Sequence, residues 1–406
     1  MDKRLKIGVM GLVRGDFALK GCLAFSDRAV VTAVCEKNEK QVEATRHLFA
    51  PETKVYTDFD EFINSGLDAV VLCNYFDEHV PYAIKAMKAG VAVMSETIAA
   101  ASLGECIDLV EAYERTGVKY MLGANCPYFK AVHAMKDKIA NKEYGRVMYA
   151  DAEYIHSSVP GADLKPPVDL DNLHWRQTLP CCYYNMHSLG PLMYITESVP
   201  VKVLGKGVRM DSPGAKKVSD MRKSFCITEM DNGAVFNTTG VVNGGTISKW
   251  FRVACETGTM ETMRNDWREE ILLESGVAEN EFKKTLPPWP LLTPEESKKY
   301  GHMVDGVGHG GIDAILMLDF IKFLEGEKEI FFDVYRSAAL AAAGILTWYS
   351  ILDGSKEYEI PDFHDKKARE IFRGDYRKPF AKSYKDLTLQ CRINPDDLEE
   401  MINIQK

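Results

Sequence analysis

The sequence predicts an α/β fold in which a parallel sheet comes first and a large open, mostly antiparallel sheet follows. Up to residue 123, short apolar strands alternate with amphipathic helices, which is typical of a parallel sheet covered on both faces. Beyond residue 124, period-two alternation and turn sequences such as MDNGA and VNGGT take over. That pattern is typical of an α+β domain whose antiparallel sheet has one open face. We therefore expect two domains, 1–123 and 124–406.

The strands expected in the first domain are short and apolar, so each is expected to be buried. In chain order, the pattern predicts strands at 5–12, 29–36, 54–57, 68–75, 91–96 and 119–125. The helices expected between them span 16–26, 38–49, 59–66, 78–89 and 102–116. Parallel strands need such crossover connections, so the alternation itself predicts parallel pairing.

The second domain is expected to open with a helix at 130–141 and a strand at 145–158. Further strands are predicted at 201–210, 223–231, 233–243, 247–256 and 258–263, and helices at 311–325 and 334–352. Two Pro-rich stretches, 159–180 and 285–308, are expected to be irregular. Loops of that length are usually functional or mobile.

Composition and charge exclude several classes of partner. The 406 residues are 46% hydrophobic and carry a net charge of −9, so no overall basic field would attract nucleic acid. No run of about eighteen apolar residues is available to span a membrane. The short apolar run after the basic start MDKR fits a first strand better than a signal peptide. We expect no nucleic-acid partner and no membrane partner.

The ten cysteines are scattered along the chain, and none forms the CxxC pair that zinc sites use. Several lie in apolar strand-like runs, where cysteine acts as a small hydrophobic residue. Free cysteines are typical of a reducing compartment. We therefore expect a cytoplasmic protein without a metal site.

The sequence GVMGLVRG follows the first strand and begins a helix, as a dinucleotide-binding turn requires. Gly8, Met10 and Gly11 would form this turn, although valine occupies position 13, where a second glycine is expected. Glu36 ends the second strand, where a carboxylate accepts hydrogen bonds from the adenosine ribose of NAD and repels the extra phosphate of NADP. The sequence thus predicts a Rossmann domain that binds NAD; an ordinary tight turn is the alternative.

Tyr184 and His187 lie three residues apart in CCYYNMHSLGPL, so one helical turn would place them on the same face. Imidazole titrates near neutrality and is a natural general base. A phenol, with a pKa near 10, needs a nearby positive charge to act as one. Tyr154 and His156 alternate along the strand expected at 145–158 and share a face. Tyr184 and His187 are either a buried hydrogen-bonded pair or the acid and base of an active site.

The order of these features resembles the Gfo/Idh/MocA oxidoreductases, which join a Rossmann domain to an open-sheet substrate domain. The sequence NYFDEH, from Asn74 to His79, resembles the T-P-N-x-x-H motif of that family in its histidine and spacing. SETIAA lies where most members have Glu-Lys-Pro: Glu96 is present, whereas Thr97 replaces the lysine and Ile98 the proline. An ordinary lysine-assisted sugar dehydrogenase is therefore not what this sequence indicates.

A narrower resemblance covers almost the whole chain. The motifs that carry it are LGECIDLVEAYERTG, AEYIHSS, HWR, YYNMHSLGP, GHGGIDAILM, DVY and IPDF, in that order. They are similar to those of glycoside hydrolase family 109, whose NAD-dependent glycosidases also lack the lysine. The resemblance implies that NAD takes hydride from C3 of the sugar, that the aglycone leaves from C1 by elimination, and that water addition and re-reduction complete the hydrolysis.

The resemblance also implies roles for individual residues. His187 would be the base for the 3-hydroxyl, and Tyr184 and Tyr154 would handle the C2 or glycosidic proton. Further cofactor-binding candidates are Asn74, His79, Glu96, Asn125, Trp175 and Arg176, and substrate-binding candidates are His156, His309 and Tyr128. His309, within GHGG, either binds sugar hydroxyls or caps a helix.

The expected substrate is a small glycoside or sugar, held by the domain at 124–406, which is also expected to form a homodimer or homotetramer through its open sheet. Two alternatives remain: a glycoside or sugar 3-dehydrogenase that releases a 3-keto sugar and NADH, and a non-catalytic NAD-binding sensor or scaffold. The valine at position 13 and Thr97 favour the sensor, whereas His187, Tyr184 and Glu36 favour an enzyme.

Overall fold

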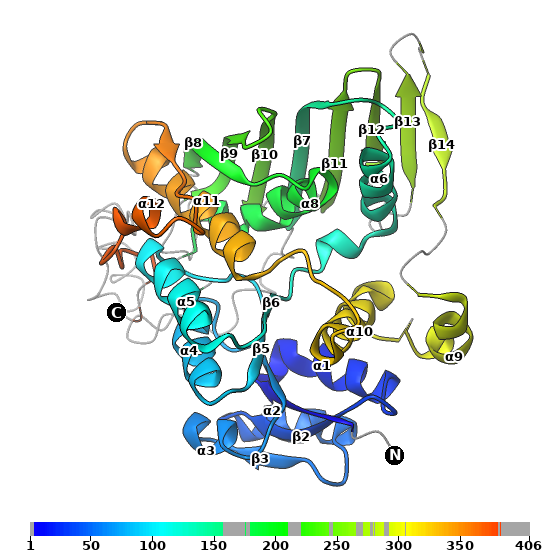
Figure 1. Ribbon diagram of the computed structural model, residues 1–406, viewed down its shortest axis with the longest axis vertical. Coiled ribbons are helices and arrows are strands. Elements are labelled where there is room, and N and C mark those ends of the chain that lie inside the picture. The colour runs from blue at the N-terminus through cyan, green and yellow to red at the C-terminus, as the bar shows by residue number, and fades with distance from the viewer. Residues whose placement is uncertain are drawn as a thin grey trace, which may run out of the picture. The chain divides into compact units, whose positions relative to one another are not determined.

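The computed structural model describes residues 4–156, 175, 179–209, 221–242, 247–264, 271–276, 279, 281–287, 292–304, 306–380 and 382. The chain forms two compact units. Unit 1 comprises Met1–Ala101, Glu105–His133 and Pro287–Ala338, and unit 2 comprises Ser102–Gly104, Ala134–Leu286 and Ala339–Lys406. The segment that closes unit 1 therefore comes from far along the chain, and Figure 1 follows its path by colour.

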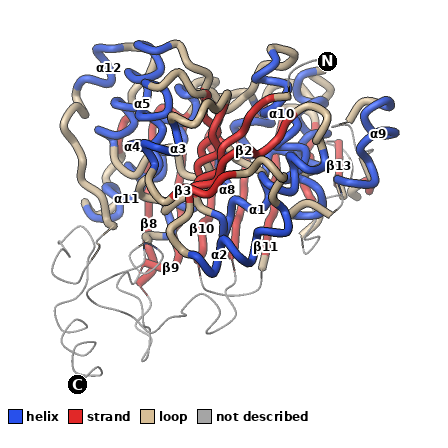
Figure 2. Tube along the Cα trace, turned by 90° about the horizontal axis from the view of Figure 1, so that it is seen from below, coloured by secondary structure: helices blue, strands red, loops and turns tan. Residues whose placement is uncertain are grey.

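Unit 1 contains a six-stranded parallel sheet in the order β3-β2-β1-β4-β5-β6, which is the Rossmann strand order. Its strands, seen side by side in Figure 2, are β1 (Leu5–Met10), β2 (Ala29–Cys35), β3 (Lys54–Tyr56), β4 (Ala69–Leu72), β5 (Ala92–Ser95) and β6 (Tyr120–Leu122). Every residue of β4, β5 and β6 is buried, as the apolar strands predict. The predicted parallel α/β domain is confirmed.

The helices of unit 1 follow the expected alternation. They are α1 (Leu12–Ala24), α2 (Glu39–Thr45), α3 (Phe59–Ile63), α4 (His79–Lys88), most of α5 (Leu103–Thr116), α9 (Pro294–Val304) and α10 (Ile312–Glu325), with short 3₁₀ turns η1 (Arg46–Leu48), η2 (Cys126–Tyr128) and η4 (His309–Gly311). Helix α10 packs directly on α1, because a Cβ at Gly21 would lie 2.7 Å from Cγ of Met317. The late segment of the chain is thus part of the core of unit 1.

Helix α9 corrects the prediction that 285–308 is irregular. It begins with a capping box: the Glu296 amide donates to Oγ1 of Thr293 (3.2 Å), and the Thr293 amide donates to a Glu296 carboxylate oxygen (2.9 Å). Pro294 is the first helical residue, where its missing N–H costs nothing. The prolines in this stretch had indicated a loop, but one of them begins a helix.

Unit 2 contains a nine-stranded sheet in the order β14-β13-β12-β11-β7-β10-β9-β8-β15. The strands are β7 (Val147–His156), β8 (Pro200–Arg209), β9 (Met221–Met230), β10 (Val235–Val242), β11 (Ser248–Cys255), β12 (Gly258–Thr262), β13 (Leu272–Gly276), β14 (Lys283–Thr285) and β15 (Tyr358–Glu359). Strands β7 and β10 pair in parallel, and the other neighbours are antiparallel. The predicted open, mostly antiparallel sheet is confirmed, with β13, β14 and β15 in addition.

Helices of unit 2 pack on one face of this sheet. They are most of α6 (Lys130–Ala140), α8 (Met186–Thr196), most of α11 (Val334–Leu352) and α12 (Lys366–Glu370), with the 3₁₀ turn η3 (Cys181–Asn185) before α8. Contacts join α8 to β7, β10 and β11, and Figure 1 shows α8 against the strands. Alternate residues of β9 and β10 are exposed, among them Phe225, Ile227 and Val235. In the part of the chain that the structure describes, no helix is long and apolar enough to cross a membrane.

Candidate active site

Predicted cofactor residues of unit 1 meet at one edge of the parallel sheet. Gly11 follows β1, Glu36 follows β2, Asn74 follows β4, Glu96 follows β5 and Asn125 follows β6. The carboxyl ends of parallel strands lie at the same edge, where ligands bind in open α/β sheets. These five residues, predicted from the sequence, therefore lie at the edge of the sheet where this fold binds ligands.

The turn after β1 requires glycine at position 11. Gly11 has a φ of +81°, and a Cβ there would lie 2.4 Å from the carbonyl oxygen of Cys73 and 2.9 Å from the amide nitrogen of Asn74. The peptide group between Cys73 and Asn74 leaves no room for a side chain, and positive φ is costly for other residues. The close approach of the two strand ends thus depends on Gly11.

Two other glycines of the motif serve packing. A Cβ at Gly8, within β1, would lie 2.4 Å from Cδ1 of Leu67, so this residue faces the core of unit 1. A Cβ at Gly15, in α1, would lie 2.7 Å from Cγ1 of Val9. Gly15 therefore allows the close helix–strand packing of a dinucleotide-binding turn. Gly15 is the last residue of GVMGLVRG, so its role could have been predicted from the sequence.

The two remaining positions of this turn differ in exposure. Met10 ends β1 and is partly buried. Val13, on the first turn of α1, is 76% exposed. In a dinucleotide-binding turn, the second glycine lets the backbone approach the pyrophosphate. Val13 therefore places an isopropyl group where the motif normally leaves space.

Glu36 connects the ends of β1 and β2. One carboxylate oxygen accepts the backbone N–H of Leu12 (3.0 Å), and the other accepts that of Asn38 (2.9 Å). Each carboxylate oxygen has two lone pairs, so each retains one acceptor site. Glu36 is thus fixed in orientation and still able to accept two hydroxyl hydrogen bonds.

Asn74 and His79 have different environments after β4. Both polar atoms of the Asn74 carboxamide are buried and lack a hydrogen-bond partner among the described residues. Buried polar groups normally have partners, so a bound ligand with donor and acceptor groups would satisfy Asn74. The residues present therefore fit a nicotinamide dinucleotide at this edge of the sheet.

His79 is 2% exposed, and its ring Nδ1 bonds to the carbonyl oxygen of Ile98 at 2.8 Å. Burial lowers the pKa of this imidazole, although the bond to Ile98 acts in the opposite direction. His79 thus holds the segment after β5 in place, and this is the contact through which it shapes the site.

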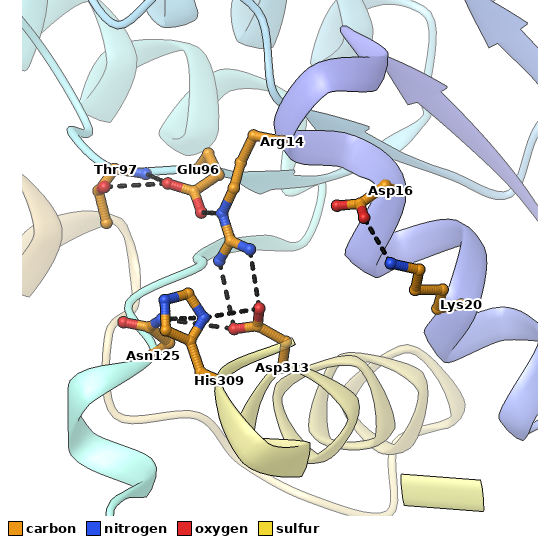
Figure 3. A network of polar contacts seen from close by, with 8 residues as sticks. All are labelled: Arg14, Asp16, Lys20, Glu96, Thr97, Asn125, His309 and Asp313. Carbon is orange, nitrogen blue, oxygen red and sulfur yellow. Dashed lines mark hydrogen bonds and ion pairs between the residues drawn. The ribbon is translucent and has the colours of Figure 1, made fainter. Parts of the chain in front are cut away.

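Arg14, on the first turn of α1, joins two carboxylates (Figure 3). Its Nε donates to Glu96 at 2.6 Å, and its Nη1 and Nη2 donate to the two oxygens of Asp313 at 2.7 and 3.2 Å. The second oxygen of Glu96 accepts the amide (2.8 Å) and hydroxyl (2.9 Å) of Thr97. Glu96, predicted from the family motif, is therefore paired with a cation that the sequence analysis missed.

Asp313, on the first turn of α10, has a fully buried side chain. It also accepts from Nδ2 of Asn125 at 3.3 Å and bonds to Nδ1 of His309 at 2.9 Å. Burial raises the pKa of Asp313, but the bonds from His309 and Arg14 outweigh it and hold the pKa well below the usual value. Arg14, Glu96, Asn125, His309 and Asp313 are called the ionic network below.

Arg14 remains charged despite its burial. Burial lowers the pKa of the guanidinium, and the charges of Glu96 and Asp313 raise it by more. The backbone of Gly308 lies close to Asp313, and only glycine fits there. A Cβ at Gly308 would lie 2.3 Å from the Asp313 carboxylate. The sequence signal that could have indicated Asp313 is its place in GHGGID, four residues after His309.

The candidate catalytic residues lie together in unit 2. Tyr154 is on β7, Tyr184 in η3 and His187 on the first turn of α8. The rings of Tyr154 and His187 stack with centroids 4.5 Å apart, those of Tyr154 and Tyr184 are 6.4 Å apart, and those of Tyr184 and His187 are 5.3 Å apart. These three residues are called the aromatic cluster below.

Two glycines allow η3 to pack closely against a strand and a helix of unit 2. Gly240 on β10 is the register partner of Tyr154, and a Cβ there would lie 2.9 Å from the carbonyl oxygen of Cys181. A Cβ at Gly344 on α11 would lie 3.1 Å from the carbonyl oxygen of Cys182. The turn is thus packed between a strand and a helix, and this packing brings Tyr184 over β7.

The remaining predicted residues have less defined surroundings. His156 ends β7, two residues after Tyr154, and Tyr128 ends η2, packed against the core of unit 1. Trp175 is partly buried. Arg176 lies outside the described residues. Apart from these four, the predicted site residues of each unit lie together.

Two family models match the chain. Residues 5–124 match the oxidoreductase family, NAD-binding Rossmann fold, which is the Gfo/Idh/MocA family. Residues 246–369 match the C-terminal domain of glycosyl hydrolase 109. The chain thus combines a match to the Gfo/Idh/MocA oxidoreductases with a match to glycosyl hydrolase 109. The predicted family, NAD cofactor and enzyme class are thereby confirmed.

Named relatives agree with this assignment. A glycosyl hydrolase family 109 protein of Parabacteroides distasonis is 25% identical, over 89% of this chain and 87% of that protein. An α-N-acetylgalactosaminidase of Tannerella forsythia is 25% identical, over 82% of this chain and 80% of that protein. Both alignments span most of each chain.

Solved structures share the fold. A levoglucosan dehydrogenase in complex with NADH and levoglucosan has a TM-score of 0.73 and 17% identity, covering 88% of this chain and 100% of that one. An oxidoreductase domain protein from Kribbella flavida has a TM-score of 0.72 and 16% identity, with coverage of 88% and 100%. The two-sheet architecture is therefore shared with NAD-binding sugar oxidoreductases.

Proposed function

We propose that this enzyme hydrolyses glycosides by transient oxidation at C3 of the sugar, elimination of the aglycone from C1, addition of water and re-reduction. The observation that carries the proposal is the aromatic cluster, in which an imidazole is stacked on one phenol and lies beside a second. Such a reaction needs groups that exchange protons with a hydroxyl and with a carbon acid, and it does not need the carboxylate pair of ordinary glycosidases.

Unit 1 is proposed to hold the cofactor. When bound, NAD supplies a hydride acceptor that returns the hydride at the end of each turnover. Glu36, fixed by two backbone amides, would accept the adenosine ribose hydroxyls. Asn74 would pair its buried carboxamide with the dinucleotide. Glu96, bound to Arg14, keeps a partly buried carboxylate at the same edge of the sheet.

Unit 2 is proposed to move the protons. His187 would accept the proton of the 3-hydroxyl as hydride leaves C3, because imidazole titrates near neutrality. The resulting ketone makes the C2 proton acidic, and Tyr154 or Tyr184 would remove it. A phenol does so only where positive charge lowers its pKa. The stacked imidazolium of His187 supplies such a charge once it has accepted its proton.

The substrate that we propose is an α-linked N-acetylgalactosaminide. Support comes from the relative in Tannerella forsythia, which is named as an α-N-acetylgalactosaminidase. The nitrophenyl α-glycoside of N-acetylgalactosamine is therefore the first probe, beside the β-anomer and the corresponding glucosides.

We also propose that copies of the chain associate through the open face of the nine-stranded sheet. Tyr149, Phe225, Ile227 and Val235 are between 37% and 44% exposed on its outer face. Several exposed apolar residues on one face of a sheet are the support for an association surface there. Light scattering should give a dimer or tetramer, and Phe225→Lys combined with Ile227→Lys should give a monomer. A wild-type monomer would contradict this part of the proposal.

The alternative is a glycoside 3-dehydrogenase that uses the same residues and releases a keto sugar and NADH. Fold similarity to levoglucosan dehydrogenase favours it. Stoichiometry separates the two reactions. The proposed glycosidase should release many aglycones per NAD without accumulating NADH, whereas the dehydrogenase consumes one NAD for each sugar. Aglycone release that is unaffected by removing NAD would contradict both.

A further inference from the structure

Polar side chains line the interior of unit 2 beneath η3, the turn that carries Tyr184. This turn contacts strands β9 and β10, and its last residue, Asn185, is 1% exposed. The buried polar and thiol side chains on η3, on these two strands and on α11 include Asn185, Ser224, Cys226, Thr228, Thr238 and Thr347. Each polar atom in such an interior needs a hydrogen-bond partner.

Three of these side chains have a polar atom without such a partner. The atoms are Nδ2 of Asn185, Oγ of Ser224 and Oγ1 of Thr238, and each is buried and unbonded to any residue that the structure describes. The other end of the Asn185 carboxamide accepts the hydroxyl of Ser188 at 2.7 Å, which holds the carboxamide in place. Leaving a buried polar group without a partner costs more than a hydrogen bond normally gains. Three such atoms in one region therefore indicate a bound ligand.

The strand register brings the three groups together. Ser224 on β9 lies opposite Gly240 on β10, and Cys226 lies opposite Thr238. Ser224 and Thr238 are thus diagonal neighbours on one face of the sheet, about 7–8 Å apart between their Cα atoms. A Cβ at Gly240 would lie 3.6 Å from the amide nitrogen of Asn185. Asn185 therefore lies over the same part of the sheet as the two hydroxyls.

The thiol of Cys226 does not satisfy these atoms. Its sulfur lies 3.3 Å from Oγ1 of Thr228 and 3.2 Å from Oγ1 of Thr347, and sulfur is a weak acceptor. Burial raises the pKa of this thiol, and the side chains of Thr228, Thr347, Thr238 and Asn185 lower it by less. Asn185 and Thr238 thus lie near a neutral thiol without a hydrogen bond to it.

The ligand that fits this region is uncharged. Glu274 and Arg369 are the buried charged side chains among the described residues of unit 2. Glu274 is bound to Lys138 and Tyr144, and Arg369 donates to the carbonyl oxygen of Phe363. With these two groups bound elsewhere, an ion beside the three polar atoms would be buried without a counter-charge, which is costly. Water is neutral and both donates and accepts, so it fits the carboxamide in either orientation.

We propose that unit 2 encloses a water molecule bound by Asn185, Ser224 and Thr238, as a fixed part of the support beneath η3. Buried waters make about three hydrogen bonds, and three polar atoms are left without a partner here. Ser224 and Gly240, which face each other, add only one hydroxymethyl group to this layer, so room remains for a small molecule. The water joins η3 to β9 and β10, and the site does not rest on the proposed function.

Crystallography of the wild-type protein tests the site directly. A structure that resolves ordered solvent should show a peak within about 2.7–3.2 Å of Nδ2 of Asn185, Oγ of Ser224 and Oγ1 of Thr238. In Thr238→Val, which keeps the shape of the side chain and removes its hydroxyl, the peak should be lost or displaced. A wild-type structure in which the three atoms bond directly to protein groups, with no solvent peak, would overturn the proposal whether or not the variant folds.

A double-mutant cycle tests whether the two hydroxyls share one ligand. Ser224→Ala and Thr238→Val should each lower the equilibrium constant for folding roughly tenfold, because each leaves a buried group with one partner fewer. When Thr238→Val is already present, the loss from Ser224→Ala should be smaller by about threefold or more. Thr239→Val, the same change on the opposite face of β10, is the matched control, and its effect should multiply with that of Ser224→Ala. Losses that multiply for Thr238→Val as well would overturn the shared water.

Discussion

The ionic network of unit 1 and the aromatic cluster of unit 2 are organised by different forces. In the network, the partly buried Arg14 is paired with the fully buried Asp313, and the pKa of Asp313 is held low by its partners although burial alone would raise it. In the cluster, Tyr154, Tyr184 and His187 are held by ring stacking and by a turn packed against glycines. The network should therefore be sensitive to charge, and the cluster to volume.

The largest effect is expected at the cluster. His187→Ala removes the proposed base for the 3-hydroxyl and should lower turnover by 10²-fold to 10⁴-fold or more, with NAD still bound because the cofactor belongs to unit 1. Aglycone release and the NAD content of the purified variant measure the two effects. His364→Ala, at an exposed histidine of the same unit, is the control. Full activity of His187→Ala would remove the cluster from the mechanism.

The next effect tests the sensitivity of the network to charge. Asp313→Ala leaves Arg14, whose side chain is 32% exposed, with Glu96 as its remaining partner, and losing charge-assisted hydrogen bonds costs about 1.5–3 kcal/mol. Chemical denaturation should show this loss in the free energy of unfolding. Arg115→Ala, which breaks an exposed pair with Glu111, is the control and should cost less than about 1 kcal/mol.

The lowered pKa of Asp313 predicts that the free energy of unfolding depends on pH. The pKa of Asp313 is lowered in the folded protein, so the ionised carboxylate adds stability above its unfolded pKa of about 3.9, and this is lost as the pH falls toward the folded value. The difference in unfolding free energy between wild type and Asp313→Asn should therefore shrink below about pH 4. A difference that stays constant down to pH 2 would show that the charge of Asp313 does not stabilise unit 1.

A smaller effect is expected at Glu36. Glu36→Ala removes charge-assisted hydrogen bonds worth about 1.5–3 kcal/mol, so the affinity for NAD should fall roughly tenfold or more. NADP should be affected less, because the repulsion of its phosphate is removed at the same time. Calorimetric titration of both cofactors measures this, with Glu43→Ala on α2 as the exposed control. An unchanged ratio of NAD to NADP affinity would show that Glu36 is not the selector.

The smallest effect tests the sensitivity of the cluster to volume. Gly240→Ala places a methyl group 2.9 Å from the carbonyl oxygen of Cys181, and overpacking of this kind costs about 1–3 kcal/mol. The displaced turn should lower turnover without changing NAD affinity. Gly301→Ala in α9, whose Cβ would lie 3.7 Å from Oγ of Ser297, is the control. Unchanged turnover in Gly240→Ala would show that η3 does not position Tyr184.

Local signals in the sequence account for much of the fold and for part of the site. Gly11, Glu36 and Asn74 were predictable because each follows a strand whose apolar run can be recognised from the local sequence alone. Arg14 was not, because its partner Asp313 lies 299 positions away and no periodicity links them. The capping box of α9 could be recognised in the sequence, but the prolines around it indicated a loop.

The nine-stranded sheet also contains elements that the sequence did not predict. Strands β13, β14 and β15 have between two and five residues and are partly exposed, so their apolar runs are short or absent. Gly240 and Gly344 are informative only once β10 and α11 are known to meet η3. Residues at strand ends can therefore be predicted from the sequence. Residues that position the site by packing against distant segments can be recognised only in the structure.

The central claim is that glycosides are cleaved through a C3-oxidised sugar, and isotope exchange at C2 tests it most directly. Hydrolysis in D₂O should place deuterium at C2 of the product sugar, and substrate deuterated at C2 should lose its label in H₂O, without net formation of NADH. Hydrolysis at the normal rate with no label gained in the first experiment and none lost in the second would contradict the elimination mechanism.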